Sequence, residues 1–268
     1  MKLQKIILLI FISLNFVYAN KLIMGYRENE RQPLIGNIYD NNGLYLELYS
    51  LAAKRIGYDL EVVRKPKKRI LLEMKQGKID FYPGFTFTHP RTKYSYFMEN
   101  GLPGGDVGIS LKDFPDINSL DDLSGRKVLV AAGGPTEARL SDLEHIKLHR
   151  VPRLSIEKAF NLIKLKRDDF YVYNKASIDF YIKVNNIDYL KVHDKCCGGY
   201  KPMYLGFSIN SDKFSYIKNP NFDRSQEITR NNLPIKIDTN SVAYKFQKAL
   251  EKMKNEGITD KLYKKYYN

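Results

Sequence analysis

Short apolar runs rich in strand-forming residues alternate with segments of helical periodicity along most of this chain. Residues 22–26 are strand-like, apolar side chains then recur at helical spacing from Leu44 to Ile56 and stop at Gly57, and residues 60–63 resume as a strand. The pattern returns after residue 110, with strands expected at 127–131, 147–151 and 169–173 and helices after Pro135 and at 155–165 and 175–184. The sequence therefore predicts two α/β units in tandem, followed by helices at 242–253 and 258–266.

The stretch from Gly77 to Arg91 places small residues and an arginine beside the end of a buried strand. A helix ends near Gly77, and residues 79–82 follow as a short strand. Ligands bind at the carboxyl ends of strands in open α/β sheets, and a guanidinium offers a planar fork of donors that matches a carboxylate. Spacing alone leaves two interpretations of Arg91 open, a carboxylate anchor and a solvated arginine in a turn.

Residues 1–19 have the pattern of a secretory signal peptide. Lys2 and Lys5 form a short basic start, residues 6–17 are apolar, and Val17-Tyr18-Ala19 suits processing. The apolar run is short for a bilayer span, and no second run of about 20 apolar residues follows. We expect a soluble mature protein, without a lipid anchor, in the periplasm of a Gram-negative cell.

The chain is basic, with a formal net charge of +14, of which Lys2 and Lys5 supply two. The only dense basic run, residues 64–69, includes Lys67 and Arg69. Behind a signal peptide this run is no nuclear signal, and nucleic acid is not an expected partner. Two interpretations remain, a solvated loop and helix start, or cations that face an anionic ligand.

Cys196 and Cys197 are the only cysteines. In an oxidising compartment they could form a vicinal disulfide, with Gly198-Gly199 easing the turn, or they could stay a buried reduced pair. The lone pair lacks the context of a catalytic nucleophile. His145 and His149 have no third ligand nearby, and we predict neither a metal site nor a cofactor.

The order of several short motifs resembles the family-three periplasmic solute-binding proteins, which include the polar amino-acid receptors of ABC transporters. The likeness covers nearly the whole mature chain. Its motifs are residues 43–48, 77–80, 88–91, 123–128 and 257–266. The resemblance implies a two-lobed α/β fold in which each lobe is an open, mostly parallel sheet flanked by helices, with two hinge crossings. It places lobe 1 at 20–109 and 208–268 and lobe 2 at 110–207.

The resemblance also implies a function and a site. Two lobes would close on a small carboxylate-bearing solute and present it to an ABC permease of the inner membrane, with the receptor acting as a monomer. Thr88 and Arg91 match the family's Thr-x-x-Arg, in which the arginine binds the α-carboxylate, and Thr86 falls where a hydroxyl helps. In lobe 2, Gly134 and Thr136 belong to the turn at a helix start whose N–H groups favour anions.

Three positions depart from the amino-acid receptors. Asn174 stands where an aspartate binds the ligand's ammonium, and Lys67 and Arg31 stand where aromatic rings stack. Together with Arg69 in the basic run, these changes predict a more anionic ligand than a neutral or basic amino acid. Two rival functions remain open: a periplasmic enzyme resembling cyclohexadienyl dehydratases, and a ligand-sensing partner of a membrane signalling protein. We expect binding without catalysis.

Overall fold

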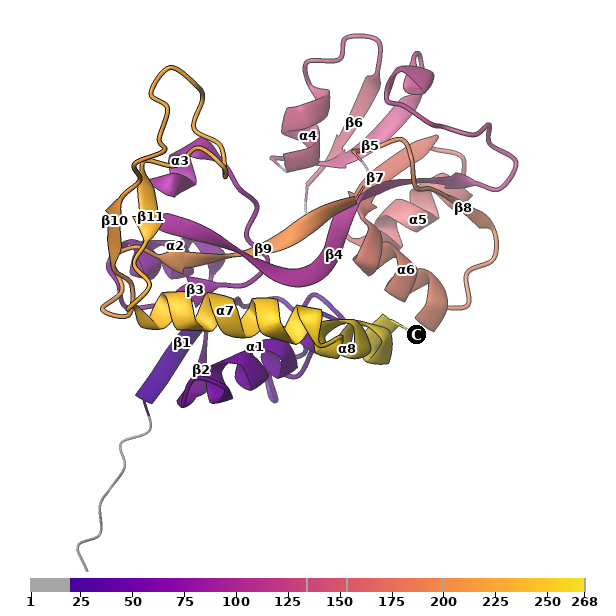
Figure 1. Ribbon diagram of the computed structural model, residues 1–268. Coiled ribbons are helices and arrows are strands. Elements are labelled where there is room, and N and C mark those ends of the chain that lie inside the picture. Colours follow the sequence, from indigo (N-terminus) through magenta and orange to yellow (C-terminus); the bar gives the residue numbers. More distant parts are fainter. Residues whose placement is uncertain (1–19, 134, 153, 199, 268) are drawn as a thin grey trace, which may run out of the picture.

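The computed structural model describes residues 20–133, 135–152, 154–198 and 200–267, so the predicted signal peptide lies outside the described residues. The chain folds into two α/β lobes joined by two long strands (Figure 1). A single nine-stranded sheet runs through both lobes in the order β2-β1-β3-β9-β4-β7-β5-β6, with β8 paired to β4. The predicted α/β class and two-lobed architecture are confirmed.

Lobe 1 is built on three parallel strands, β1 (Asn20–Arg27), β2 (Tyr58–Lys65) and β3 (Phe81–Tyr82). One face packs against α1 (Leu44–Lys54), α7 (Val242–Asn255) and α8 (Ile258–Tyr267) in the main apolar core. The other face packs against α2 (Lys67–Lys75) through Ile70 and Met74. Apolar residues three and four apart on each helix explain these faces.

Lobe 2 repeats the arrangement. Its strands β5 (Lys127–Ala131), β6 (Lys147–Val151) and β7 (Phe170–Asn174) are parallel. Helices α5 (Ile156–Lys164) and α6 (Lys175–Val184) cover one face, whereas Leu140 of α4 (Pro135–Leu140) belongs to the core on the other. The carboxyl ends of β1 and β3 and of β5 and β7 supply the loops between which the two lobes face each other, with α3 (His89–Thr92) following β3.

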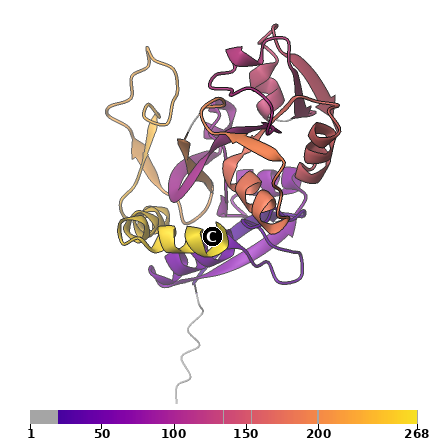
Figure 2. The ribbon, with the colours of Figure 1, turned by 90° about the vertical axis from the view of Figure 1, so that its right-hand side faces the viewer.

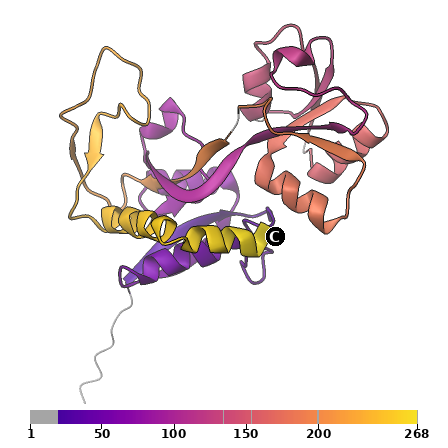
Figure 3. The ribbon, with the colours of Figure 1, turned by 45° about the vertical axis from the view of Figure 1, so that its right-hand side comes forward.

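The two crossings come earlier in the chain than predicted. Strand β4 (Ser95–Leu111) pairs with β9 (Tyr200–Ser208) up to Gly105, and from Asp106 it pairs with β7 instead. Val107 is buried in the core of lobe 2, and Leu205 in that of lobe 1. Strands β4 and β9 run between the lobes (Figure 3), and their pairing ends at Gly105 and Tyr200, a few residues before the boundaries expected at 109/110 and 207/208.

Asp80 ties the start of β3 to its neighbours. Its carboxylate accepts hydrogen bonds from the backbone N–H of Ile23 on β1 at 2.7 Å and from the Ser211 hydroxyl at 2.6 Å, and Lys213 Nζ lies 3.5 Å away. The side chain is buried, and burial raises the pKa of the carboxyl group against these partners. The aspartate of the Gly77–Asp80 motif thus positions the strand that leads to Arg91.

Cys196 and Cys197 form a vicinal disulfide with an S–S distance of 2.07 Å. Both side chains are buried between β8 (Leu190–His193) and β9, in the same core as Phe170. Of the two states left open by the sequence, the structure therefore has the vicinal disulfide.

His193, at the end of β8, should make lobe 2 sensitive to acid. Its Nδ1 accepts from the Ile117 N–H at 3.2 Å and its Nε2 lies 2.8 Å from the Ser110 hydroxyl. Burial, and then Lys191, lowers the pKa of the ring. The neutral ring's contribution to stability is complete above the unfolded pKa of about 6.5 and is lost as pH falls below it. We expect the melting temperature to fall more for the wild type than for His193→Gln between about pH 7.5 and about pH 5. Equal losses would contradict this, and exposed His89→Gln is the control.

The remaining segment of lobe 1 is a hairpin of β10 (Tyr216–Lys218) and β11 (Ile235–Ile237) with a long connection between them. Its loop projects away from lobe 2 (Figure 2). No helix among the described residues is long and apolar enough to span a bilayer.

Candidate functional site

Arg91 is held in place by its own loop. Its guanidinium lies over the Phe85 ring, 4.2 Å from the centroid, and Nη1 donates to the Thr86 carbonyl at 2.6 Å. The Phe85 N–H donates to the Tyr204 carbonyl of β9 at 2.6 Å, so the loop is anchored to a crossing strand. A guanidinium has five N–H donors. Within the described part of the chain one donates to this carbonyl, the Tyr94 hydroxyl also interacts with the guanidinium, and the remaining donors can grip a carboxylate.

Thr86 and Thr88 flank this anchor. Both are exposed, and Thr88 is the N-cap residue of α3 without a side-chain hydrogen bond to the helix. Both threonines lie on the loop that carries Arg91, and the contact of Thr86 to Arg91 is through its carbonyl.

Four cations gather at the carboxyl ends of the lobe 1 strands, and we call Arg27, Arg31, Lys67 and Arg91 the cationic cluster. Lys67 Nζ lies 5.7 Å from the centroid of the Tyr82 ring. Burial lowers the pKa of the Lys67 ammonium, and Arg91, Arg27 and Arg31 lower it further. Burial raises the pKa of Tyr82, against the effect of the same arginines. Like charges so close repel one another, so an anion placed among them would be stabilised.

Arg31 reaches from lobe 1 towards lobe 2. Its backbone exchanges hydrogen bonds with Ile35, N to O at 2.8 Å and O to N at 2.9 Å, which fixes a tight loop after β1. Its guanidinium interacts electrostatically with Tyr45, Tyr82 and Tyr267 of lobe 1 and with Tyr173 of β7 in lobe 2. The charge of Arg31 therefore acts on tyrosines of both lobes.

Arg69 is outside this cluster. Its Nε donates to Glu73 at 2.8 Å, one turn along α2, and Lys65 contacts the same carboxylate at 2.7 Å. The pairing follows the i, i+4 spacing of a helix. Because Arg69 is paired with Glu73, we do not assign it to the ligand.

The turn of lobe 2 is partly used by the protein itself. The Gly133 N–H donates to Glu137 Oε2 at 2.6 Å, and Glu137 Oε1 accepts from Arg150 Nε. Pro135 has no N–H to offer. Gly134 lies outside the described residues, and Thr136 is half-buried within α4. Glu137 thus takes an N–H group that the sequence assigned to the ligand.

Arg139, also on α4, was not recognised from the sequence. Its Nη1 lies 3.2 Å from Asp106 on the crossing strand β4, while Nε and Nη2 are buried without a protein partner among the described residues. The pair holds α4 to the hinge.

Asn174 caps α6. Its Oδ1 accepts from the Ser177 N–H at 3.3 Å and its Nδ2 donates to the Gly105 carbonyl on β4 at 3.3 Å. The residue expected to contact the ligand therefore joins a helix start to the crossing strand, next to Tyr173.

Asn174→Asp tests how much charge matters here. Aspartate is as good an N-cap as asparagine, so unfolding stability should change by less than about 1 kcal/mol. The new negative charge should weaken an anionic ligand about tenfold, measured by calorimetry. Asn185→Asp makes the same charge change at the other end of α6 and should leave affinity unaltered. Unchanged affinity in Asn174→Asp would remove this residue from the site.

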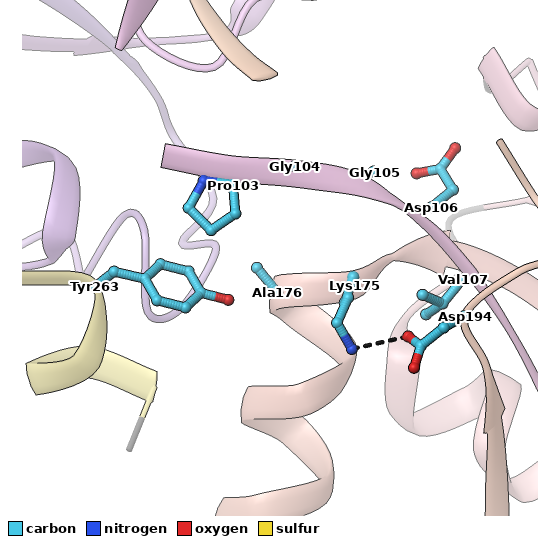
Figure 4. Close-up of a pocket in the computed structure, with 9 residues that line it drawn as sticks. All are labelled: Pro103, Gly104, Gly105, Asp106, Val107, Lys175, Ala176, Asp194 and Tyr263. Atoms are coloured by element: carbon cyan, nitrogen blue, oxygen red, sulfur yellow. Dashed lines mark hydrogen bonds and ion pairs between the residues drawn. The ribbon is translucent and has the colours of Figure 1, made fainter. Parts of the chain in front are cut away.

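A cavity of about 240 Å³ lies between the hinge, α6 and α8 (Figure 4). Pro103, Ala176 and the ring of Tyr263 form apolar walls, and at one end Lys175 bonds Asp194 at 2.9 Å. Both lobes contribute walls, so rotation about the hinge must change its shape.

Comparison with known proteins agrees with this geometry. The model of the bacterial extracellular solute-binding proteins, family 3, matches residues 24–268. The arginine-binding extracellular protein ArtP of Bacillus subtilis (strain 168) is 27% identical over 249 residues, covering 92% of this chain and 86% of that protein.

Two solved structures show the same fold. An ancestral arginine-binding protein bound to arginine has a TM-score of 0.64 at 24% identity, covering 93% of this chain and 99% of its own. The GluR0 ligand-binding core of Nostoc punctiforme in complex with L-glutamate has a TM-score of 0.64 at 19% identity, covering 92% and 99%.

Proposed function

Because the chain belongs to the bacterial extracellular solute-binding proteins of family 3, we propose that it is the receptor of an ABC importer that binds a small carboxylate-bearing solute between its two lobes. The observation that carries this proposal is the position of Arg91. The Phe85 ring and the Thr86 carbonyl hold its guanidinium, and the loop is hydrogen-bonded to the crossing strand β9. Most of the N–H donors of Arg91 are left for a ligand. Thr86 and Thr88 would assist, and Asn174 and Thr136 would approach from lobe 2 as it closes.

Relatives support an amino-acid-like ligand without fixing its side chain. ArtP is named for arginine, whereas the GluR0 core was solved with L-glutamate. In this chain the charges that depress the pKa of Lys67 are all arginines. A cationic side chain would meet Arg31 and Lys67, so these two positions favour a ligand more acidic than arginine.

The compartment follows from the same family. Its members are extracellular, and the signal-peptide pattern of residues 1–19 would direct this chain to the periplasm, where a monomer could deliver solute to the permease. A sensing role would use the same closure and differ only in the membrane partner.

We infer binding without turnover. A structural neighbour described as an ancestral amino-acid-binding protein is a precursor of cyclohexadienyl dehydratase, with a TM-score of 0.64 at 21% identity, so the fold is compatible with catalysis. At Asn174 the present chain has a neutral amide that is occupied in capping α6. A neutral amide does not serve as a general base.

The test is a calorimetric screen of the protein against amino acids, each paired with its α-carboxamide. A required α-carboxylate predicts binding of the acid and loss of binding by the amide. Nuclear magnetic resonance of the released ligand should then show it unaltered. Equal binding of both forms would refute the role of Arg91, and conversion of the ligand would establish the enzyme instead.

A further inference from the structure

Three buried polar groups in and near the cationic cluster have no protein partner among the described residues. Among the described residues, Arg31 Nε and the hydroxyl groups of Tyr45 and Tyr267 are buried with no hydrogen-bond partner. Tyr45 is 1% exposed and Tyr267 7% exposed. Electrostatic interactions connect Arg31 with both tyrosines and the tyrosines with each other. We call Arg31, Tyr45 and Tyr267 the Arg31 subsite.

The chemistry of these three groups identifies the kind of ligand group that would bind to them. Leaving a buried polar group unpaired is unfavourable, so such groups normally have a partner from the protein, water or a ligand. A guanidinium only donates. Burial raises the pKa of both phenols, which therefore keep their protons and can donate as well. Three unpaired donors, one of them charged, would be satisfied by an acceptor with a negative charge.

The Arg31 subsite adjoins the carboxylate anchor. The Tyr45 hydroxyl lies directly under Gly84, where any side chain would collide with it, and Gly84 begins the loop that carries Thr86 and Arg91. The Tyr267 ring stacks on Tyr263 at 4.3 Å, and Tyr263 lines the cavity between the lobes (Figure 4). The subsite therefore lies between the Arg91 loop and space that both lobes enclose.

We propose that the ligand has a second anionic group and that Arg31, Tyr45 and Tyr267 receive it while Arg91 binds the first. This inference rests on the proposed function and narrows its ligand class to dianionic solutes, such as an acidic amino acid or a dicarboxylate. It also gives the C-terminal helix α8 a direct part in ligand selection, through Tyr267.

The experiment compares acids with their side-chain amides by calorimetry, using L-aspartate with L-asparagine, L-glutamate with L-glutamine, and succinate with succinamate, together with L-arginine. In the wild type at least one acid should bind about tenfold more tightly than its amide, because the subsite pairs its charge. Arg31→Gln should reduce that ratio to near one. Tyr267→Phe, which removes only a hydroxyl, should reduce the ratio about threefold.

Tyr266→Phe is the matched control on the same helix, because its hydroxyl donates to Glu47 at 2.9 Å. It should keep the wild-type ratio. Tighter binding of L-arginine, equal binding of acid and amide, or a ratio that survives in both Arg31→Gln and Tyr267→Phe would overturn the dianionic ligand. If one of these results is found and Arg91→Ala still abolishes binding, the dianionic ligand is rejected and the proposed function is kept. Failure of the whole panel to bind would overturn both.

Discussion

Arg91→Ala is expected to weaken ligand binding about a hundredfold while leaving the ligand-free protein nearly as stable as the wild type. A charge-assisted hydrogen bond contributes about 1.5–3 kcal/mol, and 2.7 kcal/mol corresponds to a factor of about 100 in affinity. The side chain is only half-buried, so its removal should cost less than about 1 kcal/mol of unfolding free energy. Calorimetry with the tightest ligand and thermal unfolding without ligand measure the two effects.

Two further variants separate the geometry of Arg91 from its charge. Arg91→Lys keeps the charge and loses the planar fork, so it should recover only part of the affinity. Arg126→Ala removes another guanidinium that lies over a ring, at 5.1 Å from the centroid of Phe114, and should bind like the wild type. An Arg91→Ala protein with wild-type affinity would exclude the assigned anchor.

Asp80→Ala should destabilise the protein by about 3 kcal/mol. Removing this buried carboxylate leaves the Ile23 N–H, the Ser211 hydroxyl and Lys213 without their shared acceptor. Leaving buried polar and charged groups without a partner costs an unfolding free energy in this range. Lobe 1 should lose most of this stability, so the midpoint of urea unfolding should fall. Ligand affinity should also decline, because the end of β3 that leads to Arg91 is held less firmly.

Asp59→Ala on β2 is the control for Asp80→Ala, because Asp59 is exposed and should change stability by no more than about 0.5 kcal/mol. Asp80→Asn keeps an acceptor oxygen for Ile23 and should fall between the two. A midpoint for Asp80→Ala equal to that of Asp59→Ala would show that the network contributes nothing to stability.

The sequence predicted elements with clear local signals. Strands β5 and β6 and helix α6 have the expected bounds because apolar periodicity and flanking turn residues agree there. Strand β4 lacks such a local signal in its middle. Pro103, Gly104 and Gly105 read locally as a break, yet pairing with β9 continues the strand through them. Tertiary pairing overrode local preference, as is usual for strands.

The candidate site also combines features with a local sequence signal and features without one. The Arg69–Glu73 pair and the Asn174 cap are local and could have been recognised from i, i+4 spacing and from an asparagine before a helix. The meeting of Arg31 with Tyr45 and Tyr267 joins segments far apart in the chain, and the resemblance placed only Arg31 there. Long-range clusters of this kind leave no periodic signal.

Small-angle X-ray scattering with and without saturating ligand tests the central claim, closure of two lobes on a carboxylate held by Arg91. The account predicts that the radius of gyration of the wild type falls on addition of ligand, and that Arg91→Ala at the same ligand concentration stays at the ligand-free value. An unchanged radius of gyration in wild-type protein that calorimetry shows to be saturated would contradict it.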